Sequence, residues 1–388
     1  MNQGMSDNPF DGQIPFPEDT FPDEAALNAG WDAPPEEDLP PKDAGDLLND
    51  FAEDFADSVA HLAPLPELPP EPEYPEMPTG DAGTAPVPQR ATAPASLRNG
   101  GGNGLAAREE ELLAGLNPAQ RAAVVHHGSP LLIVAGAGSG KTSVLTRRVA
   151  WLLAHGVAPW QILAITFTNK AAAEMRERVT DLVGPVAERM WLSTFHSLCV
   201  RILRANAQLI EGLNTNFTIY DSDDQKRLIT MVLKDHDCDL KEFAPRAVLS
   251  VISNWKNELQ GPAEALKETQ EDGNRHREQI ALVYRDYQAR LRESNAVDFD
   301  DLIGEVVWML QANPAVADHY RRRFRHVLVD EYQDTNHAQY VLVSTLVGEG
   351  PGAGELCVVG DADQSIYAFR GATIRNIEEF ERDYPHAE

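Results

Sequence analysis

Short apolar runs and amphipathic helical patterns alternate along most of the chain. Five runs of three to five mostly apolar residues lie at positions 131–134, 162–166, 190–193, 327–329 and 356–359. Runs this short, separated by helical patterns, are typical of strands that are buried on both faces of a sheet. The pattern at 171–183, which stops before Gly184-Pro185, is one such intervening helix. The alternation predicts an α/β fold in which helices cover both faces of a parallel sheet.

The interval 221–298 breaks this alternation. It is rich in helix-forming residues and contains no apolar run typical of a strand. We interpret it as a helical subdomain inserted into the α/β domain, whose two parts then cover residues 105–220 and 299–388. A helix is expected to start near the beginning of the α/β domain, with Asn117 as its N-cap and Pro118 in its first turn.

The N-terminal segment has a different composition from the rest of the chain. Its first 100 residues hold 21 acidic and three basic residues, together with 18 of the 27 prolines. Such a segment buries too little apolar surface to offset the entropy of folding, so we expect a disordered acidic, proline-rich tail and linker over 1–104. Its aromatic patches and the amphipathic stretch 46–62 either recruit a repair protein or a single-stranded-DNA-binding protein, or are simply solvated.

A glycine-rich loop follows the first apolar run and precedes a helical pattern, which is the setting of a phosphate-binding loop. Glycines let backbone N–H groups approach an anion closely, and the helix N-terminus adds a favourable dipole. Lys141 is suited to contact the terminal phosphates of ATP, and the Thr142 hydroxyl to bind Mg²⁺. The expected nucleotide contacts are Ala135, Gly136, Ala137, Gly138, Ser139, Gly140, Lys141, Thr142 and Ser143.

Two acidic residues, Asp330 and Glu331, follow the fourth apolar run directly. Ligands of open parallel sheets bind at the carboxyl ends of the strands, so this pair is expected beside the phosphate-binding loop. We assign Asp330 to Mg²⁺ binding and Glu331 to orienting and activating the attacking water.

The resemblance to a known family becomes specific at this second motif. Asp330-Glu331-Tyr332-Gln333-Asp334-Thr335-Asn336 resembles the second helicase motif of the UvrD/PcrA/Rep family of superfamily 1 DNA helicases. Further segments are similar to that family's motifs in the same order: 116–121 (adenine recognition), 164–172 (motif Ia), 194–196 (motif Ib), 298–302 (the return from the inserted subdomain) and 358–372 (motif III). The resemblance implies a RecA-like P-loop NTPase domain, and it implies that Gln120 contacts the adenine.

The segment that resembles motif III combines phosphate-binding and base-stacking side chains. Gln364 and Arg370 are placed to sense the γ-phosphate. Tyr367 and Phe369 are either stacking platforms for bases or core residues, and the family's usual tryptophan is Phe369 here. The resemblance adds contacts to single-stranded DNA from motifs Ia and Ib, at Phe167, Thr168, Asn169, Lys170, Thr194 and His196. Asn169 could equally cap the following helix.

The resemblance implies an ATP- and Mg²⁺-dependent 3′–5′ DNA helicase or translocase that acts on single-stranded DNA and at single-strand/duplex junctions in repair or replication restart. Because the chain ends at Glu388, it corresponds to the first motor domain, and the alternative is an ATP- and single-stranded-DNA-binding module with a recruiting tail and little turnover. The chain is net acidic even outside the tail, so contacts to nucleic acid must be local, and the basic run 321–325 is interpreted as a solvated turn. The absence of an 18-residue apolar run argues against a membrane partner, and three widely spaced cysteines fit a reducing cytoplasm.

Overall fold

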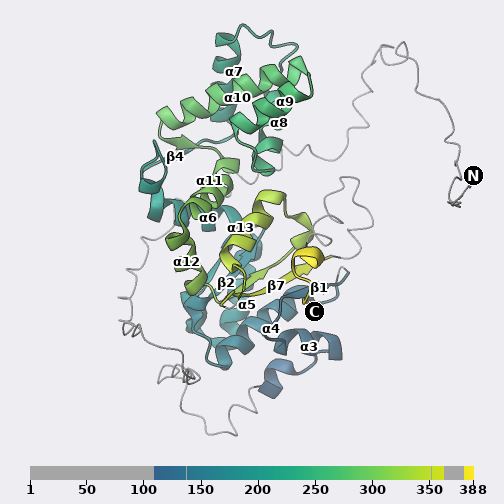
Figure 1. The fold of residues 1–388 in the computed structure, drawn as a ribbon. Helices are drawn as coiled ribbons and strands as arrows, with labels where there is room; N and C mark the ends of the chain where they lie inside the picture. Colours follow the sequence, from purple (N-terminus) through teal and green to yellow (C-terminus); the bar gives the residue numbers. More distant parts are fainter. Residues whose placement is uncertain (1–108, 137, 351, 362–379) are drawn as a thin grey trace, which may run out of the picture. The chain divides into compact units, whose positions relative to one another are not determined.

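The central element of the fold is a five-stranded parallel sheet. A computed structural model of the chain describes residues 109–388 except 137, 351 and 362–379, so the predicted tail and linker lie outside the described residues. The strand order is β1-β7-β6-β2-β3, and every neighbouring pair is parallel (Figure 1). The strands are β1 (Leu131–Val134), β2 (Ile162–Thr166), β3 (Trp191–Thr194), β6 (His326–Val329) and β7 (Glu355–Gly360). The predicted α/β fold and all five predicted strands are confirmed, with ends that differ by at most one residue.

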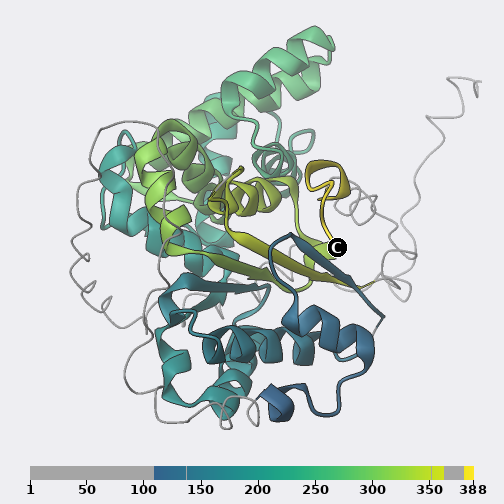
Figure 2. The ribbon, with the colours of Figure 1, turned by 60° about the horizontal axis from the view of Figure 1, so that its bottom comes forward.

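Two sets of helices cover the two faces of the sheet. Alternate residues of a strand point to opposite faces, and because both sets are apolar, both faces must be buried. In β7, Leu356 and Val358 belong to one core, whereas Cys357 and Val359 belong to the other. The first core is completed by α6 (Phe195–Asn206), α11 (Phe299–Ala312), α12 (Pro314–Arg323) and α13 (His337–Val347). The second core is completed by α3 (Pro118–Val125), α4 (Lys141–Ala154) and α5 (Asn169–Val183), the blue helices of Figure 2.

The helices begin where the sequence provides caps. Asn117 and Gln120 form a reciprocal capping box at the start of α3, as the Asn117-Pro118 pattern predicts. Thr168, and not Asn169, caps α5, so the alternative role of Asn169 as a cap is wrong. Short 3₁₀ turns connect other elements: η4 (Pro159–Gln161), η5 (Pro185–Arg189), η6 (Ala207–Leu209) and η7 (Tyr332–Asp334).

Between β3 and β6 the chain forms four helices with a hydrophobic core of their own, shown in green in Figure 1. They are α7 (Ser222–Asp235), α8 (Pro245–Asn257), α9 (Pro262–Glu271) and α10 (Arg275–Glu293). A short parallel pair, β4 (Thr218–Ile219) with β5 (Ala296–Val297), brings the entry and the exit of this segment together. The sequence pattern missed β5, because a two-residue strand has no periodicity to detect.

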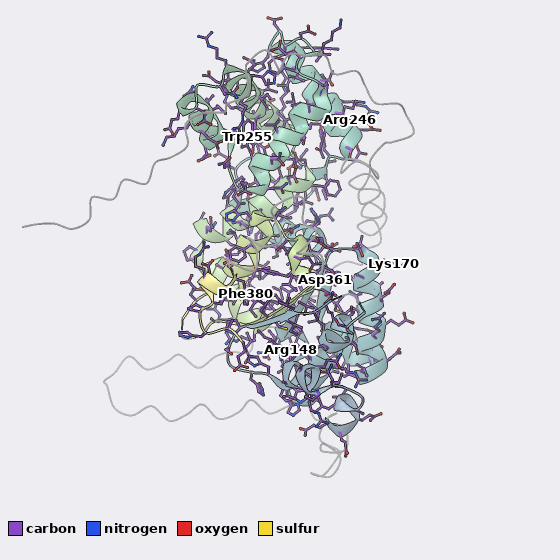
Figure 3. All side chains as sticks on the ribbon, turned by 90° about the vertical axis from the view of Figure 1, so that its right-hand side faces the viewer. Arg148, Lys170, Arg246, Trp255, Asp361 and Phe380 are labelled. Carbon is purple, nitrogen blue, oxygen red and sulfur yellow. The ribbon has the colours of Figure 1, made fainter. Side chains whose placement is uncertain are left out.

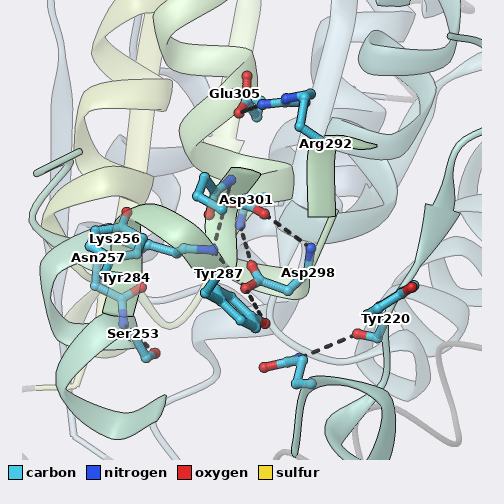
Figure 4. Close-up of polar contacts among 12 residues, drawn as sticks. Tyr220, Ser253, Lys256, Asn257, Tyr284, Tyr287, Arg292, Asp298, Asp301 and Glu305 are labelled. Carbon is cyan, nitrogen blue, oxygen red and sulfur yellow. Dashed lines mark hydrogen bonds and ion pairs between the residues drawn. The ribbon is translucent and has the colours of Figure 1, made fainter. Parts of the chain in front are cut away.

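A buried ion cluster joins these helices to the rest of the fold. Lys256 Nζ of α8 lies 2.6 Å from Asp298 Oδ2 and 2.7 Å from Asp301 Oδ1, at the start of α11 (Figure 4). Tyr287 of α10 donates its hydroxyl hydrogen to Asp298 Oδ2 at 3.1 Å. All four side chains are almost fully buried, so the cluster fixes the position of α8 and α10 on α11. No helix in the described part of the chain is long and apolar enough to cross a membrane.

Candidate active site

The loop between β1 and α4 has the backbone geometry of an anion-binding loop. Gly138 and Gly140 adopt φ values of +73° and +86°, a left-handed conformation that disfavours any side chain. A Cβ on Gly140 would also lie 3.2 Å from Gln120 Nε2, a tight contact that would require the Gln120 amide to shift. The loop leads directly into α4, whose first residue is Lys141. Ala137, one of the expected contacts, lies outside the described residues.

Lys141 is held at the carboxyl ends of the central strands. Its Nζ lies 2.7 Å from Asp361 Oδ2 and donates to the carbonyl oxygen of Ala135 at 3.0 Å. Both charged side chains are at least nine-tenths buried. Asp361 follows β7, which lies between β1 and β6, so this ion pair joins the phosphate-binding loop to the next strand. The sequence pattern did not predict this role for Asp361; the position one residue after a buried strand was the available signal.

Asp330 and Glu331 follow β6 at the same end of the sheet. Burial, and then the neighbouring charge of Glu331, raise the pKa of Asp330 to about 6, although Lys141 acts in the opposite direction. The Asp330 Oδ1 atom accepts a hydrogen bond from the Glu331 backbone N–H at 3.0 Å. Glu331 itself has a φ of +51°, which is rare for a residue with a side chain. The backbone turn after β6 therefore adopts a left-handed conformation at the very residue assigned to activate water.

Gln333 links Glu331 to Asp361, and sequence reasoning missed it. Its Nε2 donates to Glu331 Oε2 at 2.7 Å, and its Oε1 accepts a hydrogen bond from the Asp361 backbone N–H at 2.9 Å. The side chain is 3% exposed, so water does not compete for these bonds. Gln333 therefore holds the Glu331 carboxylate in a defined position relative to the end of β7.

Gln120 connects α3 to the phosphate-binding loop, and Arg148 connects α3 to α4. Gln120 Nε2 donates to the carbonyl oxygen of Ser139 at 2.9 Å, and its Oε1 accepts from the Asn117 backbone N–H at 3.0 Å. The Gln120 amide is therefore already engaged by protein atoms next to the loop. Arg148 of α4 is 2% exposed and donates to the carbonyl oxygens of Ala123 and His126, which end α3 (Figure 3).

The segment with the remaining expected phosphate and stacking residues is outside the described part of the chain. Gln364, Tyr367, Phe369 and Arg370 all lie in 362–379, and their roles stay predictions. Both ends of this interval are anchored beside the Asp330–Glu331 turn. Asp361 is held by Gln333, and Phe380 packs against Tyr332 with ring centres 5.9 Å apart.

The residues expected to contact DNA from motif Ia follow the carboxyl end of β2. Phe167 is half-buried, and its ring lies 5.7 Å from that of Phe195 in an edge-to-face arrangement. Thr168 accepts a hydrogen bond from the Ala171 backbone N–H at 3.0 Å, and Asn169 begins α5. Lys170 is exposed at the start of the same helix (Figure 3). Part of the Phe167 ring and the charge of Lys170 are thus accessible at this end of the sheet.

The residues expected to contact DNA from motif Ib follow β3, the neighbour of β2. The Thr194 side chain is 2% exposed, caps α6 and donates to Ser197 Oγ at 3.0 Å, so its hydroxyl is used inside the fold. His196 is half-buried, and its ring packs edge-to-face on Phe299 with centres 5.8 Å apart. Burial lowers the pKa of His196 to about 4, which keeps the ring neutral at physiological pH.

The residues at the sheet end fit a nucleotide with a magnesium ion better than a free metal ion. No group of three or more His, Cys, Asp and Glu side chains in the described ranges is arranged to hold a metal. Mg²⁺, however, commonly binds one or two carboxylates, with waters and substrate phosphates as its other ligands. Asp330 is a buried carboxylate with a raised pKa, and a nearby cation would stabilise its charged form. Thr142, whose hydroxyl is the second expected ligand, lies in the first turn of α4.

This combination of a parallel sheet, a glycine-rich loop with Lys141 and an acidic pair at adjacent strand ends defines a P-loop nucleotide-binding domain. A model of the UvrD/REP helicase N-terminal domain family matches residues 116–385. Because the match covers more than half of the sequence, the chain belongs to this family. The resemblance recognised from the motifs is confirmed.

Several curated helicases are similar to this chain. It is 68% identical over 281 residues to the ATP-dependent DNA helicase UvrD1 of Mycobacterium tuberculosis, an alignment that covers 71% of this chain and 36% of that protein. It is 64% identical over 285 residues to UvrD1 of Mycobacterium leprae. It is 52% identical over 278 residues to the ATP-dependent DNA helicase PcrA of Bacillus subtilis, with 71% and 37% coverage. The chain thus spans little more than a third of the length of these relatives.

Proposed function

We propose that the chain is the ATP-binding motor part of a DNA helicase or translocase that moves 3′ to 5′ on single-stranded DNA. The observation that carries this proposal is the meeting of Lys141, Asp361, Asp330 and Glu331 at the carboxyl ends of three adjacent strands. The names of the related proteins, which call them ATP-dependent DNA helicases, support the same conclusion. The direction of movement rests on the family resemblance alone.

In this proposal the chain's own residues bind and orient ATP. The loop N–H groups and Lys141 hold the phosphates, and Lys141 exchanges Asp361 for phosphate oxygens when the nucleotide enters. Thr142 and Asp330 hold Mg²⁺, which neutralises charge on the phosphates. Glu331 accepts the proton of the attacking water, and Gln333 keeps the Glu331 carboxylate in place. Gln364 and Arg370 are proposed to contact the γ-phosphate, as the motif predicts.

The proposed DNA contacts lie at the ends of β2 and β3. Phe167 and the neutral His196 ring offer surfaces on which bases stack, together with Tyr367 and Phe369. Thr168, Asn169 and Lys170 are proposed to contact phosphates. Thr194 is proposed to act by fixing the start of α6, and hence the position of His196, because its own hydroxyl is bonded to Ser197.

The wider role is also proposed from the resemblance. It comprises action at single-strand/duplex junctions in repair or replication restart in the cytoplasm, and recruitment of a repair or single-stranded-DNA-binding protein by the acidic segment 1–104.

The experiment is ATP hydrolysis by the 388-residue chain with and without single-stranded DNA, measured for wild type and Glu331→Gln. Single-turnover conditions, with the protein in excess over ATP, make even slow hydrolysis measurable. General-base catalysis contributes ~10²–10⁴-fold, so Glu331→Gln should lose that factor and retain ATP binding. Equal rates in both proteins would contradict the assignment of Glu331. Turnover that single-stranded DNA leaves unchanged would contradict the proposed coupling to DNA.

A further inference from the structure

Three arginines from three different helices converge on the start of β3. The Cζ atom of Arg323, the last residue of α12, lies 5.0 Å from the centre of the Trp191 ring. The Cζ atom of Arg201, from α6, lies 5.5 Å from the same ring. Arg176, from α5, donates to the carbonyl oxygen of Leu192 at 2.6 Å. Guanidinium groups from both sides of the sheet therefore meet at its edge strand, and we call these three residues with Trp191 the arginine cluster.

The positive charge of the arginine cluster is not balanced within the described part of the chain. No carboxylate among the described residues lies within the 4.0 Å ion-pair distance of these three guanidinium groups. Burial, and then the like charge of Arg176, lower the pKa of Arg201, which is the opposite of what an acidic neighbour would do. In addition, Arg323 Nε is buried without a hydrogen-bond partner.

Two neighbouring arginines of the basic run, by contrast, have polar partners within the fold. Arg321 donates to the carbonyl oxygen of Thr345 and pairs with Asp318, and Arg325 donates to carbonyl oxygens that include that of Ala353. The interpretation of the basic run as a solvated turn is therefore wrong, because it closes α12 and most of it is partly buried. Two of its arginines stabilise local structure, whereas Arg323 contacts aromatic rings and bonds to no described acid.

The chemistry of the arginine cluster suits phosphate groups. A guanidinium held over an aromatic ring keeps its N–H groups free to bind phosphate oxygens in pairs, and little side-chain entropy remains to be lost. Because two guanidinium groups already lie over the Trp191 ring, this indole is a poor platform for a base. The ligand is therefore expected to be bound through its backbone.

The arginine cluster also lies close to the proposed DNA contacts. Trp191 begins β3 and Thr194 ends it, so the two ends of the strand are about 10 Å apart at ~3.3 Å per residue. Arg201 lies on the same helix as His196, a little more than one turn further along. A DNA strand that passes His196 needs only a few more nucleotides to reach Arg201 and Arg323.

We propose that the arginine cluster is a second contact for the phosphate backbone of single-stranded DNA, and that it extends the DNA site from His196 along the outer edge of β3. This inference rests on the proposed function, since it extends the same DNA path. It adds backbone contacts that are independent of sequence and that short oligonucleotides do not reach.

The test is fluorescence anisotropy of the 388-residue chain with labelled oligo(dT) of roughly 6 to 20 nucleotides, a span chosen around known single-strand site sizes. The variant is Arg201→Ala/Arg323→Ala. The matched control is Arg178→Ala/Arg227→Ala, which removes the same charge from two exposed arginines in surface ion pairs. Thermal unfolding checks that both variants are folded, and Arg201→Lys/Arg323→Lys serves if the alanine variant is not.

The proposal predicts that Arg201→Ala/Arg323→Ala weakens binding of the longest oligonucleotide about tenfold and leaves the shortest one unchanged. The slope of log K against log salt should fall by about 1.4 for the long oligonucleotide, because each single-strand phosphate contact accounts for ~0.7. The control variant should match wild type.

Three results would overturn the proposal. One is an equal loss for short and long oligonucleotides, and another is an equal loss in the control, because both would indicate a general charge effect. The third is unchanged DNA binding by the variant, together with one of two other changes. Self-association of the variant would show that the arginines protect the sheet edge, and loss of poly-glutamate binding in the variant would show that they bind an acidic protein. If wild type binds no oligonucleotide of any length, the proposed function itself fails.

Discussion

Replacing Lys256 by methionine removes the only positive partner that Asp298 and Asp301 contact in the buried ion cluster of the described structure. Methionine keeps most of the length of the lysine side chain but none of its charge. In the wild type, Lys256 Nζ is 2.6 Å and 2.7 Å from the two carboxylates, and the three side chains are 2%, 3% and 1% exposed. Burial lowers the Lys256 pKa, but Asp298 and Asp301 outweigh it, so the pKa lies above its ordinary value.

The size of the effect follows from the burial of the cluster. Removing one partner of a buried ion pair costs about 3–5 kcal/mol, because an uncompensated charge remains inside the protein. For a domain of this size, 1 kcal/mol shifts the unfolding midpoint by roughly 2–4 °C, so Lys256→Met should lower it by about 6–20 °C. The control Lys267→Met removes an exposed lysine, 3.9 Å from Glu271, and should cost at most about 0.5 kcal/mol.

The loss should depend on pH with a defined sign. Burial, and then the charge of Asp298, raise the pKa of Asp301 to about 7 and that of neighbouring Asp300 to about 6. The folded state therefore binds more protons than the unfolded state between about pH 4 and 7, and these groups cost increasing stability as pH rises through that window. Without Lys256 this cost is larger, so the deficit of Lys256→Met should be greatest above pH 7 and should shrink towards pH 5.

Thermal unfolding followed by circular dichroism at pH 5.5 and 7.5 measures both effects. A deficit below about 1 kcal/mol at pH 7.5, or one that is the same at both pH values, would show that Lys256 does not compensate the buried charges of Asp298 and Asp301. The triple variant Lys256→Met/Asp298→Asn/Asp301→Asn removes the charges together and should recover part of the lost stability, because no buried charge of this set is then left alone.

Three further predictions concern the site and its support. Gln333→Ala should slow single-turnover ATP hydrolysis about tenfold or more with little change in ATP affinity, because Glu331 loses its 2.7 Å hydrogen bond to Gln333. An unchanged rate would show that residues other than Gln333 fix the position of Glu331. Arg148→Met should lower the free energy of unfolding, measured by denaturant titration, by about 2–4 kcal/mol, because the carbonyl oxygens that end α3 lose a buried donor. Exposed Arg178→Met should change that free energy by less than about 0.5 kcal/mol. His196→Phe should keep the affinity for oligo(dT) within about twofold, whereas His196→Ala should lose it, because the ring is proposed to stack on a base. Burial lowers the pKa of His196 to about 4, so this residue should add no pH dependence to binding between pH 6 and 8. A wild-type affinity that rises towards pH 6, and no longer does so in His196→Phe, would contradict the stacking role.

The sheet could be predicted from the sequence because its signals are local. Each strand is a short apolar run. The loop contains Gly138 and Gly140 where its backbone needs positive φ values, which glycine adopts readily. The acidic pair could be placed beside the loop because the carboxyl ends of parallel strands lie together.

What could not be predicted depends on contacts between residues far apart in the chain. The pairing of Lys141 with Asp361 joins residues 220 positions apart, and no spacing pattern indicates it. Gln333 belongs to a recognised motif, but its two hydrogen bonds emerge only when β6 and β7 lie side by side. The arginine cluster was missed because its three arginines come from α5, α6 and α12, and only one of them lies in the basic run.

The proposed function requires that the chain binds Mg²⁺ and ATP through the loop, Lys141 and Asp330. Calorimetric titration of the 388-residue chain with ATP, with and without Mg²⁺, tests it most directly. The account predicts one saturable site that Mg²⁺ strengthens, at least about tenfold weaker binding in Lys141→Ala and unchanged binding in the control Lys170→Ala. Binding by Lys141→Ala that equals that of wild type, or no ATP binding by the wild-type chain, would contradict it.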